Sequence, residues 1–248
     1  MSGHSKWATT KHKKAATDKA RGKLFAKLIR QVEVAAREGG GDVNANATLR
    51  TMFAKAREAS VPMDTIERAI KRGTGELEGV RYEAVSYEGY APAGVAVIVE
   101  CLTDNRNRTG AEVRTIFTRG GGSMAEPGAV SWQFERKGVV LLPRSVDEET
   151  LTLVAVDAGA EDLTDDGDTW RVTCAPTDLA RVRAGLEEAG LAVESAELAM
   201  VSTTSVPLGE EDARKVLRVM DALEDHDDVQ SVWSNFDIPD AVLEAVEA

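Results

Sequence analysis

VVLLPRSVDEETLTLVAVDAGAEDLTDDGDTWRVTC (residues 139–174) contains the clearest changes of hydrophobic period in the chain, and the fold class follows from them. The apolar run at 139–142 predicts a strand, and residues 147–158 predict a helix. Further strands are expected near 160–164 and 169–174, with a turn at the acidic residues 165–168. A helix over 178–189 and a strand over 193–202 complete the order β-α-β-β-α-β, which is the ferredoxin-like split βαβ unit.

The segments on both sides of this unit predict a second α+β layer. Strands are expected at 82–88, 95–102 and 130–135, and a helix at 109–119 starts at Thr109 as its N-cap, three residues before Glu112. A helix at 210–223 and a strand at 229–236 follow. Because each set of elements is complete only under this grouping, we expect the split βαβ unit to be inserted into the other α+β domain.

The first 76 residues predict a small helical domain. Apolar stripes at helical spacing indicate one helix from about residue 17 to the glycines 39–41, a second over 46–59, and a third that carries the capping pair Asp64 and Glu67 and stops at Gly73. The predicted fold is therefore α+β, with an N-terminal three-helix domain followed by two ferredoxin-like α+β domains. The domain boundaries are 1–76, then 77–136 plus 205–248, with 137–204 inserted as the third domain.

Charge is distributed very unevenly along the chain. Ten Lys and Arg against three acids give residues 1–38 a net charge of +7, and because the whole chain carries −12, residues 39–248 carry −19. A molecule of this kind is drawn to polyanions at one end and repelled by them at the other. We therefore expect it to dock end-on, with the acidic domains directed away from the polyanion.

Motifs of the common enzyme classes do not occur in the sequence. There is no HExxH, GxxxxGK[ST] or GxSxG pattern, and the two cysteines, Cys101 and Cys174, stand alone in apolar runs. The sequence therefore predicts a protein that is not an enzyme and that uses neither a cofactor nor a metal. The N-terminus has no apolar segment, and no run approaches the ~18–20 apolar residues of a membrane helix, which favours a cytoplasmic protein without membrane contact.

A nucleic-acid-binding face is predicted at the basic end. Lysines at helical spacing lie opposite the apolar stripe of the first helix and continue a basic segment that contains one aromatic residue, Trp7. A solvated helix face is the alternative explanation of such a stripe. The predicted contact residues are Lys6, Trp7, Lys11, Lys13, Lys14, Lys19, Arg21, Lys23, Lys27 and Arg30.

A second contact is predicted in the loop that follows the strand at 95–102. It consists of Asn105, Arg106, Asn107 and Arg108. The arginines could bind phosphates. Equally, Asp104 and Asn105 could shape the turn while the arginines pair with nearby acids. The sequence does not separate these alternatives.

Several segments together closely resemble the YebC family of bacterial proteins, to which the mitochondrial translational activator of cytochrome c oxidase also belongs. They are GHSKW (3–7), KHKKAATDKARGKLF (11–25), GGGDVNANATLR (39–50), RAIKRGTGE (68–76), YEGYAPAGVAVIVECLTDNRNRT (87–109) and GGGSMAEPGAVSWQFERKG (120–138). The resemblance implies a helical N-terminal domain and two α+β domains. Ala91 and Ala93 stand where the family usually has glycine, and residues 123–126 also depart from its pattern, which could alter these loops because alanine tolerates positive φ poorly.

The resemblance implies one of two functions. Members of the family are generally described as probable DNA-binding transcriptional regulators, whereas others look like ribosome-associated factors that help translation through difficult sequences. Either function needs nucleic acid at the basic end, as DNA or as ribosomal or transfer RNA, and leaves the acidic domains to contact a ribosomal protein or the transcription machinery. A Lys-rich segment suits phosphate-dense RNA with weak sequence readout, while the family's usual description favours DNA.

Overall fold

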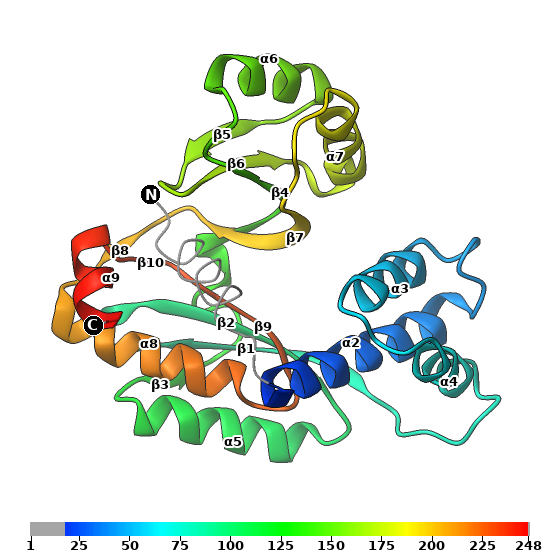
Figure 1. Cartoon of the computed structure of the whole chain (residues 1–248). Helices are drawn as coiled ribbons and strands as arrows, with labels where there is room; N and C mark the ends of the chain where they lie inside the picture. The colour runs from blue at the N-terminus through cyan, green and yellow to red at the C-terminus, as the bar shows by residue number, and fades with distance from the viewer. Residues whose placement is uncertain (1–17, 248) are drawn as a thin grey trace.

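The computed structural model describes residues 18–247, apart from the side chains of residues 18–20, 240, 244 and 247. Its elements form three groups, which we call the helical region, the larger sheet and the smaller sheet (Figure 1). Helices come first in the chain and antiparallel sheets follow, so the predicted α+β class is confirmed.

Three helices make up the helical region: α2 (Asp18–Gly39), α3 (Ala47–Glu58) and α4 (Met63–Thr74). Their apolar stripes cover one another, with Val32 of α2, Leu49 of α3 and Ile66 of α4 in one buried cluster. Asn46 caps α3, since its side chain accepts a hydrogen bond from the Leu49 amide at 3.0 Å.

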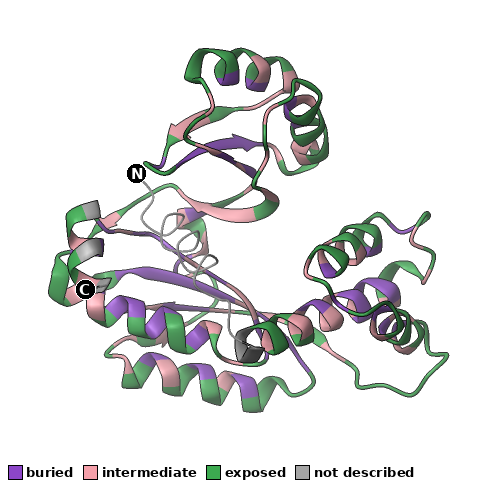
Figure 2. Ribbon diagram, viewed as in Figure 1, coloured by how far each residue is buried: buried purple, intermediate pink, exposed green. Residues whose placement is uncertain are grey.

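The larger sheet has four antiparallel strands in the order β3-β1-β2-β9. They are β1 (Glu83–Tyr90), β2 (Ala96–Thr103), β3 (Ser123–Ala125) and β9 (Val229–Ser234). Helices α5 (Arg106–Arg119) and α8 (Glu210–Glu224) cover one face (Figure 1). Successive residues of β2, such as Val97 and Ile98, belong to apolar clusters on opposite faces, and Figure 2 shows the strand buried along its length. Burial on both faces explains the apolar run at 95–102, which Glu100 alone interrupts.

The smaller sheet has the order β5-β6-β4-β7 and is also antiparallel. Its strands are β4 (Phe134–Pro143), β5 (Asp162–Asp165), β6 (Thr169–Cys174) and β7 (Ser195–Ser202). Helices α6 (Glu148–Ala158) and α7 (Leu179–Glu188) pack on one face. This connectivity is that of the predicted split βαβ unit, although the strands expected at 130–135 and 139–142 are one strand, β4.

The two sheets differ in topology. The centre of the larger sheet is a hairpin of consecutive strands, β1 and β2, whereas the central strands of the smaller sheet, β6 and β4, are not consecutive. Only the smaller sheet therefore has the ferredoxin-like order. All of its strands lie between β3 and β9 in the chain, which agrees with an insertion, while the domain boundaries themselves stay a prediction.

Two helix starts differ from the prediction. The N-cap of α4 is Pro62 and no side chain caps the helix, so Asp64 and Glu67 do not form a capping box. The N-cap of α5 is Asn105, one turn before the expected Thr109. In both cases the predicted cap is a polar residue inside the first turn, two residues after the true cap in α4 and four residues after it in α5.

Gly73 does not stop α4, as the sequence suggested. The helix continues to Thr74 and ends at Gly75, which adopts φ +83°. A Cβ on residue 73 would lie 2.4 Å from the carbonyl oxygen of Glu33 in α2. Glycine is needed there because the two helix backbones approach closely.

Short elements complete the chain. The strands β8 (Val206–Pro207) and β10 (Phe236–Asp237) form a parallel pair, and α9 (Asp240–Glu247) follows. The 3₁₀ turns are η1 (Pro92–Gly94), η2 (Ser131–Gln133) and η3 (Pro176–Asp178). Ala93 in η1 has φ 60°, so this loop keeps a backbone that favours glycine, at a cost of about 1–2 kcal/mol. Within residues 18–247, none of the helices has the length and apolar character needed to cross a bilayer.

Candidate nucleic-acid interface

Helix α2 contacts the larger sheet through basic side chains. We call Lys23, Lys27 and Arg30 the basic face of α2, and residues 224–228 the acidic loop. Lys23 Nζ donates to the carboxylate of Asp225 at 2.5 Å and to its carbonyl at 2.9 Å. Lys27 Nζ donates to the carbonyl of Glu224 at 2.8 Å. Residues about 200 positions apart in the sequence are thereby held together.

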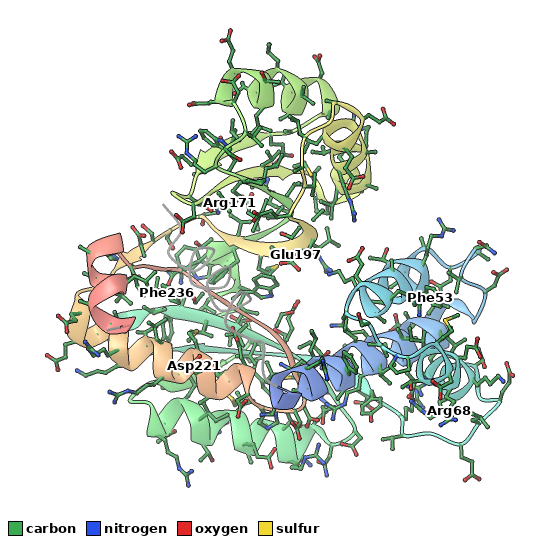
Figure 3. All side chains as sticks on the ribbon, in the orientation of Figure 1. Phe53, Arg68, Arg171, Glu197, Asp221 and Phe236 are labelled. Carbon is green, nitrogen blue, oxygen red and sulfur yellow. The ribbon has the colours of Figure 1, made fainter. Side chains whose placement is uncertain are left out.

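The acidic loop begins at the C-terminus of α8, which explains why lysines bind there. The last carbonyls of a helix have no donor within the helix and lie at the negative end of its dipole. The last turn of α8 contains no basic residue of its own, and the ammonium groups of α2 bind the carbonyls of Glu224 and Asp225 instead. Figure 3 shows α2 next to this end of α8, where Asp221 is labelled.

Asp228 is the buried centre of the acidic loop, with a side chain only 5% exposed. Its Oδ1 accepts from Arg30 at 3.0 Å, and its Oδ2 accepts from Arg108 at 2.6 Å. Oδ2 also accepts from the hydroxyl of Thr109 at 2.7 Å, which in turn lies 2.7 Å from the hydroxyl of Thr103. One carboxylate thus joins α2, the first turn of α5 and the end of β2.

The surroundings of Asp228 keep it ionised. Burial alone raises the pKa of this carboxyl group, but hydrogen bonds from Arg108 and Thr109 and the charges of Arg108 and Arg30 outweigh the effect of burial. The pKa of Asp228 therefore lies below its usual value, and the group is negatively charged at neutral pH.

The predicted second contact, residues 105–108, is only partly available to a ligand. Asn105 caps α5, since its Oδ1 accepts from the Arg108 amide at 3.0 Å. Arg108 pairs with three acids: Asp228 at 2.6 Å, Asp104 at 2.9 Å and Glu112 at 3.8 Å. These residues follow the alternative in which the loop is shaped by its polar groups and the arginine pairs with acids. Arg106 and Asn107 are exposed, and within the described part of the chain their side chains form no hydrogen bond or ion pair.

A cleft of about 690 Å³ opens between α2, the acidic loop and the start of α5. Lys23, Arg30 and Arg108 line it together with the acidic loop. The guanidinium of Arg30 lies 5.3 Å from the ring centre of Tyr82, at cation–π distance. Charges of both signs are therefore paired across the cleft.

Three possible metal ligands also meet at this cleft. The ligand atoms of Glu112, His226 and Asp228 all lie within 4.8 Å of one another. However, His226 Nδ1 accepts from the Asp228 amide at 3.1 Å, and His226 Nε2 lies 2.9 Å from Glu112 Oε2. Arg108 pairs with both carboxylates. The arrangement is that of an ion-pair network in which an arginine balances the acids.

Two family models together match most of the chain. Residues 5–76 match the model described as "TACO1/YebC protein N-terminal domain", and residues 82–236 match "TACO1/YebC second and third domain". The chain belongs to the TACO1/YebC family. It is similar to a "probable transcriptional regulatory protein" of Thermobifida fusca (strain YX), with 58% identity over 98% of both chains. A relative of the same description from Acidothermus cellulolyticus is 59% identical over 99% of this chain and 100% of its own.

A solved structure has the same fold. The crystal structure of a conserved hypothetical protein from Aquifex aeolicus is 47% identical, has a TM-score of 0.81, and covers 90% of this chain and 93% of its own. The fold of this TACO1/YebC family member is therefore shared with a distant bacterial relative over nearly its whole length.

The predicted contact residues of this family member fall into three groups. Lys6, Trp7, Lys11, Lys13 and Lys14 lie outside the described residues, as does the side chain of Lys19. Arg21 is exposed near the start of α2. Lys23, Lys27 and Arg30 are half-buried against the acidic loop. An acidic segment of the same chain therefore contacts this part of the basic stripe, while the end-on docking on a polyanion stays a prediction.

Sequence reasoning missed the acidic loop as a partner of α2. Residues 225–228 form a turn rich in acids around His226. The available signal was complementary charge: a lysine stripe and an acidic turn in one chain attract each other. Their pairing could not be assigned because nothing local in the sequence connects them.

Proposed function

We propose that the chain is a cytoplasmic nucleic-acid-binding regulator of gene expression that acts as a transcriptional regulator and contacts DNA through its basic N-terminal end. The observation that carries this proposal is the charge of +7 on residues 1–38 against −19 on the remainder. Relatives over 50% identical across the whole chain are described as probable transcriptional regulatory proteins, which supports the same function.

Binding would depend on phosphates rather than on base edges. A major-groove recognition helix presents side chains that read bases, such as Asn, Gln and Arg. Helix α4 does not have this pattern, because its exposed side carries charges of both signs. Asp64 and Glu67 lie beside Arg68, and Arg68 pairs with Asp64 at 3.5 Å. This supports a cation-rich segment that tracks the backbone with weak sequence readout.

The same observation favours a second candidate, a ribosome-associated factor that binds ribosomal RNA and relieves stalled translation. Phosphate-dense RNA surfaces suit a basic segment without a recognition helix. Under either function the acidic α+β domains would contact a protein of the transcription machinery or of the ribosome. Sedimentation of the tagged protein with ribosomes, compared with its crosslinking to chromosomal DNA, distinguishes the two candidates.

Charge-removing substitutions in the full chain test the proposal. The variant Lys11→Gln, Lys13→Gln, Lys14→Gln is compared with a control that removes three exposed arginines from α5 and α8: Arg114→Gln, Arg119→Gln, Arg218→Gln. If about five phosphates are neutralised, log K against log salt for duplex DNA has a slope of about −4.5, and the lysine variant should reduce it to about −2. Equal loss of binding in the control would refute an N-terminal binding site.

A further inference from the structure

We propose that the acidic loop and nucleic acid compete for the basic face of α2, so that docking of α2 on the larger sheet restrains nucleic-acid binding. This inference rests on the proposed function, because it assigns a regulator to the same basic end. While α2 is docked, only the cations nearer the N-terminus would bind the polyanion. Once α2 is released, Lys23, Lys27 and Arg30 would join them.

Each of the three residues of the basic face already donates to an acceptor within the chain. Lys23 binds one residue through both carboxylate and carbonyl, and Lys27 binds a helix-terminal carbonyl. Arg30 Nη1 binds the carbonyl of Asp227 and the carboxylate of Asp228. All of these acceptors belong to the five residues of the acidic loop. Two of the acceptors are carboxylate oxygens and three are backbone carbonyls. Carboxylate and phosphate oxygens are acceptors of the same kind for Lys and Arg, so the acidic loop binds cations that a phosphate backbone could bind.

Docking and nucleic-acid binding at this face exclude each other. The acidic loop contains four acidic residues: Glu224, Asp225, Asp227 and Asp228. A phosphate that reached Lys23 in the docked form would lie within the Debye length of these carboxylates, which is about 8 Å at physiological salt. Repulsion by the loop therefore adds to the loss of available donors.

The interface is built so that it can open. The apolar clusters of the helical region and of the larger sheet have no residue in common, and the contacts of the basic face are polar. Asp225 is 68% exposed and Lys23 is 27% exposed, and an ion pair of this exposure contributes little to stability. Residues 75–82, between α4 and β1, form neither helix nor strand and are mostly exposed. Release of α2 would break polar contacts and leave both apolar cores intact.

The size of the effect follows from the coupling of two equilibria. A ligand that binds only the released form has its apparent affinity reduced by the fraction of molecules in that form. Because an ion pair as exposed as that of Lys23 with Asp225 contributes up to about 1 kcal/mol, weakening it should tighten binding by up to about fivefold. It should also steepen the salt dependence, because each additional phosphate contact on duplex DNA changes the slope by about −0.9.

Two matched substitutions in the acidic loop distinguish the release of α2 from the general effect of removing one negative charge. Asp225→Asn weakens the contact with Lys23, whereas Asp227→Asn removes the same charge from a side chain that is exposed and not hydrogen-bonded to the described residues. Binding is measured by fluorescence anisotropy of a labelled DNA duplex and of an RNA hairpin at several salt concentrations. We expect tighter binding and a steeper salt slope for Asp225→Asn, and a small gain with an unchanged slope for Asp227→Asn. Equal effects of the two variants would overturn the proposal.

A reversible crosslink tests the same inference without changing the charges. The side chains of Gln31 on α2 and Gln230 on β9 are in contact, with Nε2 and Oε1 3.2 Å apart. The variant Gln31→Cys, Gln230→Cys can be joined by a short bis-methanethiosulfonate crosslinker, and the native Cys101 and Cys174 are buried. The crosslinked protein should bind the duplex about tenfold more weakly, with a shallower salt slope, than after reduction with dithiothreitol.

The outcomes of the crosslinking experiment distinguish the two proposals. Equal affinity and equal slope before and after reduction would overturn the competition while leaving the proposed function in place. Absence of binding to both duplex and hairpin in either form would overturn the proposed function and the competition with it.

Discussion

Asp228→Asn should loosen the contacts among α2, α5 and the larger sheet. The substitution keeps the shape of the side chain but leaves one oxygen where two are used. In the native protein Oδ2 accepts from Arg108 and Thr109, and Oδ1 accepts from Arg30 at 3.0 Å. If the asparagine oxygen takes the place of Oδ2, its NH₂ group takes the place of Oδ1 and faces the guanidinium of Arg30. Two donors then oppose each other, and the remaining hydrogen bonds lose the assistance of the charge.

The magnitude follows from burial of the acid and exposure of its partner. Removing one member of a buried charged group costs about 3–5 kcal/mol. Asp228 is 5% exposed, but Arg30 is 20% exposed and can be solvated once it is released, and asparagine keeps one acceptor. We therefore expect a loss of about 2–3 kcal/mol in the stability of the larger sheet.

Native-state hydrogen exchange measures this loss locally. The amide of Leu102 donates to the Asp228 carbonyl at 2.9 Å, and the amide of Thr109 lies in the first turn of α5. Exchange of these amides should accelerate about 30- to 140-fold, while amides of α6 and α7 keep their rates. Asp227→Asn is the matched control. An Asp228→Asn variant that exchanges at the control's rate would show that the network adds nothing to stability.

Two further predictions concern packing and pH. Gly73→Ala should destabilise the helical region by about 2–3 kcal/mol, because its Cβ would stand 2.4 Å from the Glu33 carbonyl oxygen. The control Gly75→Ala changes a residue with φ +83° that has open space around it, and it should cost about 1 kcal/mol. If thermal unfolding showed Gly75→Ala to be the more destabilising of the two, the packing argument would be contradicted. Burial raises the pKa of Glu88, but hydrogen bonds from the amides of residues 128, 130 and 131 hold this pKa below its usual value. The pKa of Asp228 is also lowered. The stability from both carboxylates should be complete above their ordinary pKa of about 4 and be lost as pH falls below it, and a urea midpoint that stays constant or rises between pH 5 and pH 2 would contradict this.

Much of the fold could be predicted because hydrophobic period is a local signal. The helices over 148–158, 179–188 and 210–224 and the four strands of the smaller sheet lie close to their predicted ranges. The strands β3, β8 and β10 were not predicted, since two or three residues are too few to establish a period. Gly73 was misinterpreted because a glycine that ends a helix and one that admits a neighbouring helix have the same local pattern.

The candidate interface could be predicted only in part. The basic stripe on α2 was visible in the sequence because lysines recur at helical spacing. The partner of that stripe was not, because Lys23 and Asp225 are 202 positions apart and a charge pattern does not distinguish an external polyanion from an acidic turn of the same chain. Likewise, the role of Thr109 depends on its hydrogen bond to Asp228, which no spacing rule anticipates.

The pairing of β4 with β7 has a consequence for the entropy of folding. Val97 of β2 pairs with Ser234 of β9, 137 positions further on, so the larger sheet closes a very long loop. Phe134 pairs with Ser202, and these residues are 68 positions apart. Once the smaller sheet has formed, Phe134 at its start and Ser202 at its end lie side by side. The flexible loop between Val97 and Ser234 is then halved to about 69 residues. Each halving of a loop reduces its closure cost by about 0.6 kcal/mol. Formation of the smaller sheet therefore lowers the entropy cost of pairing β9 with β2.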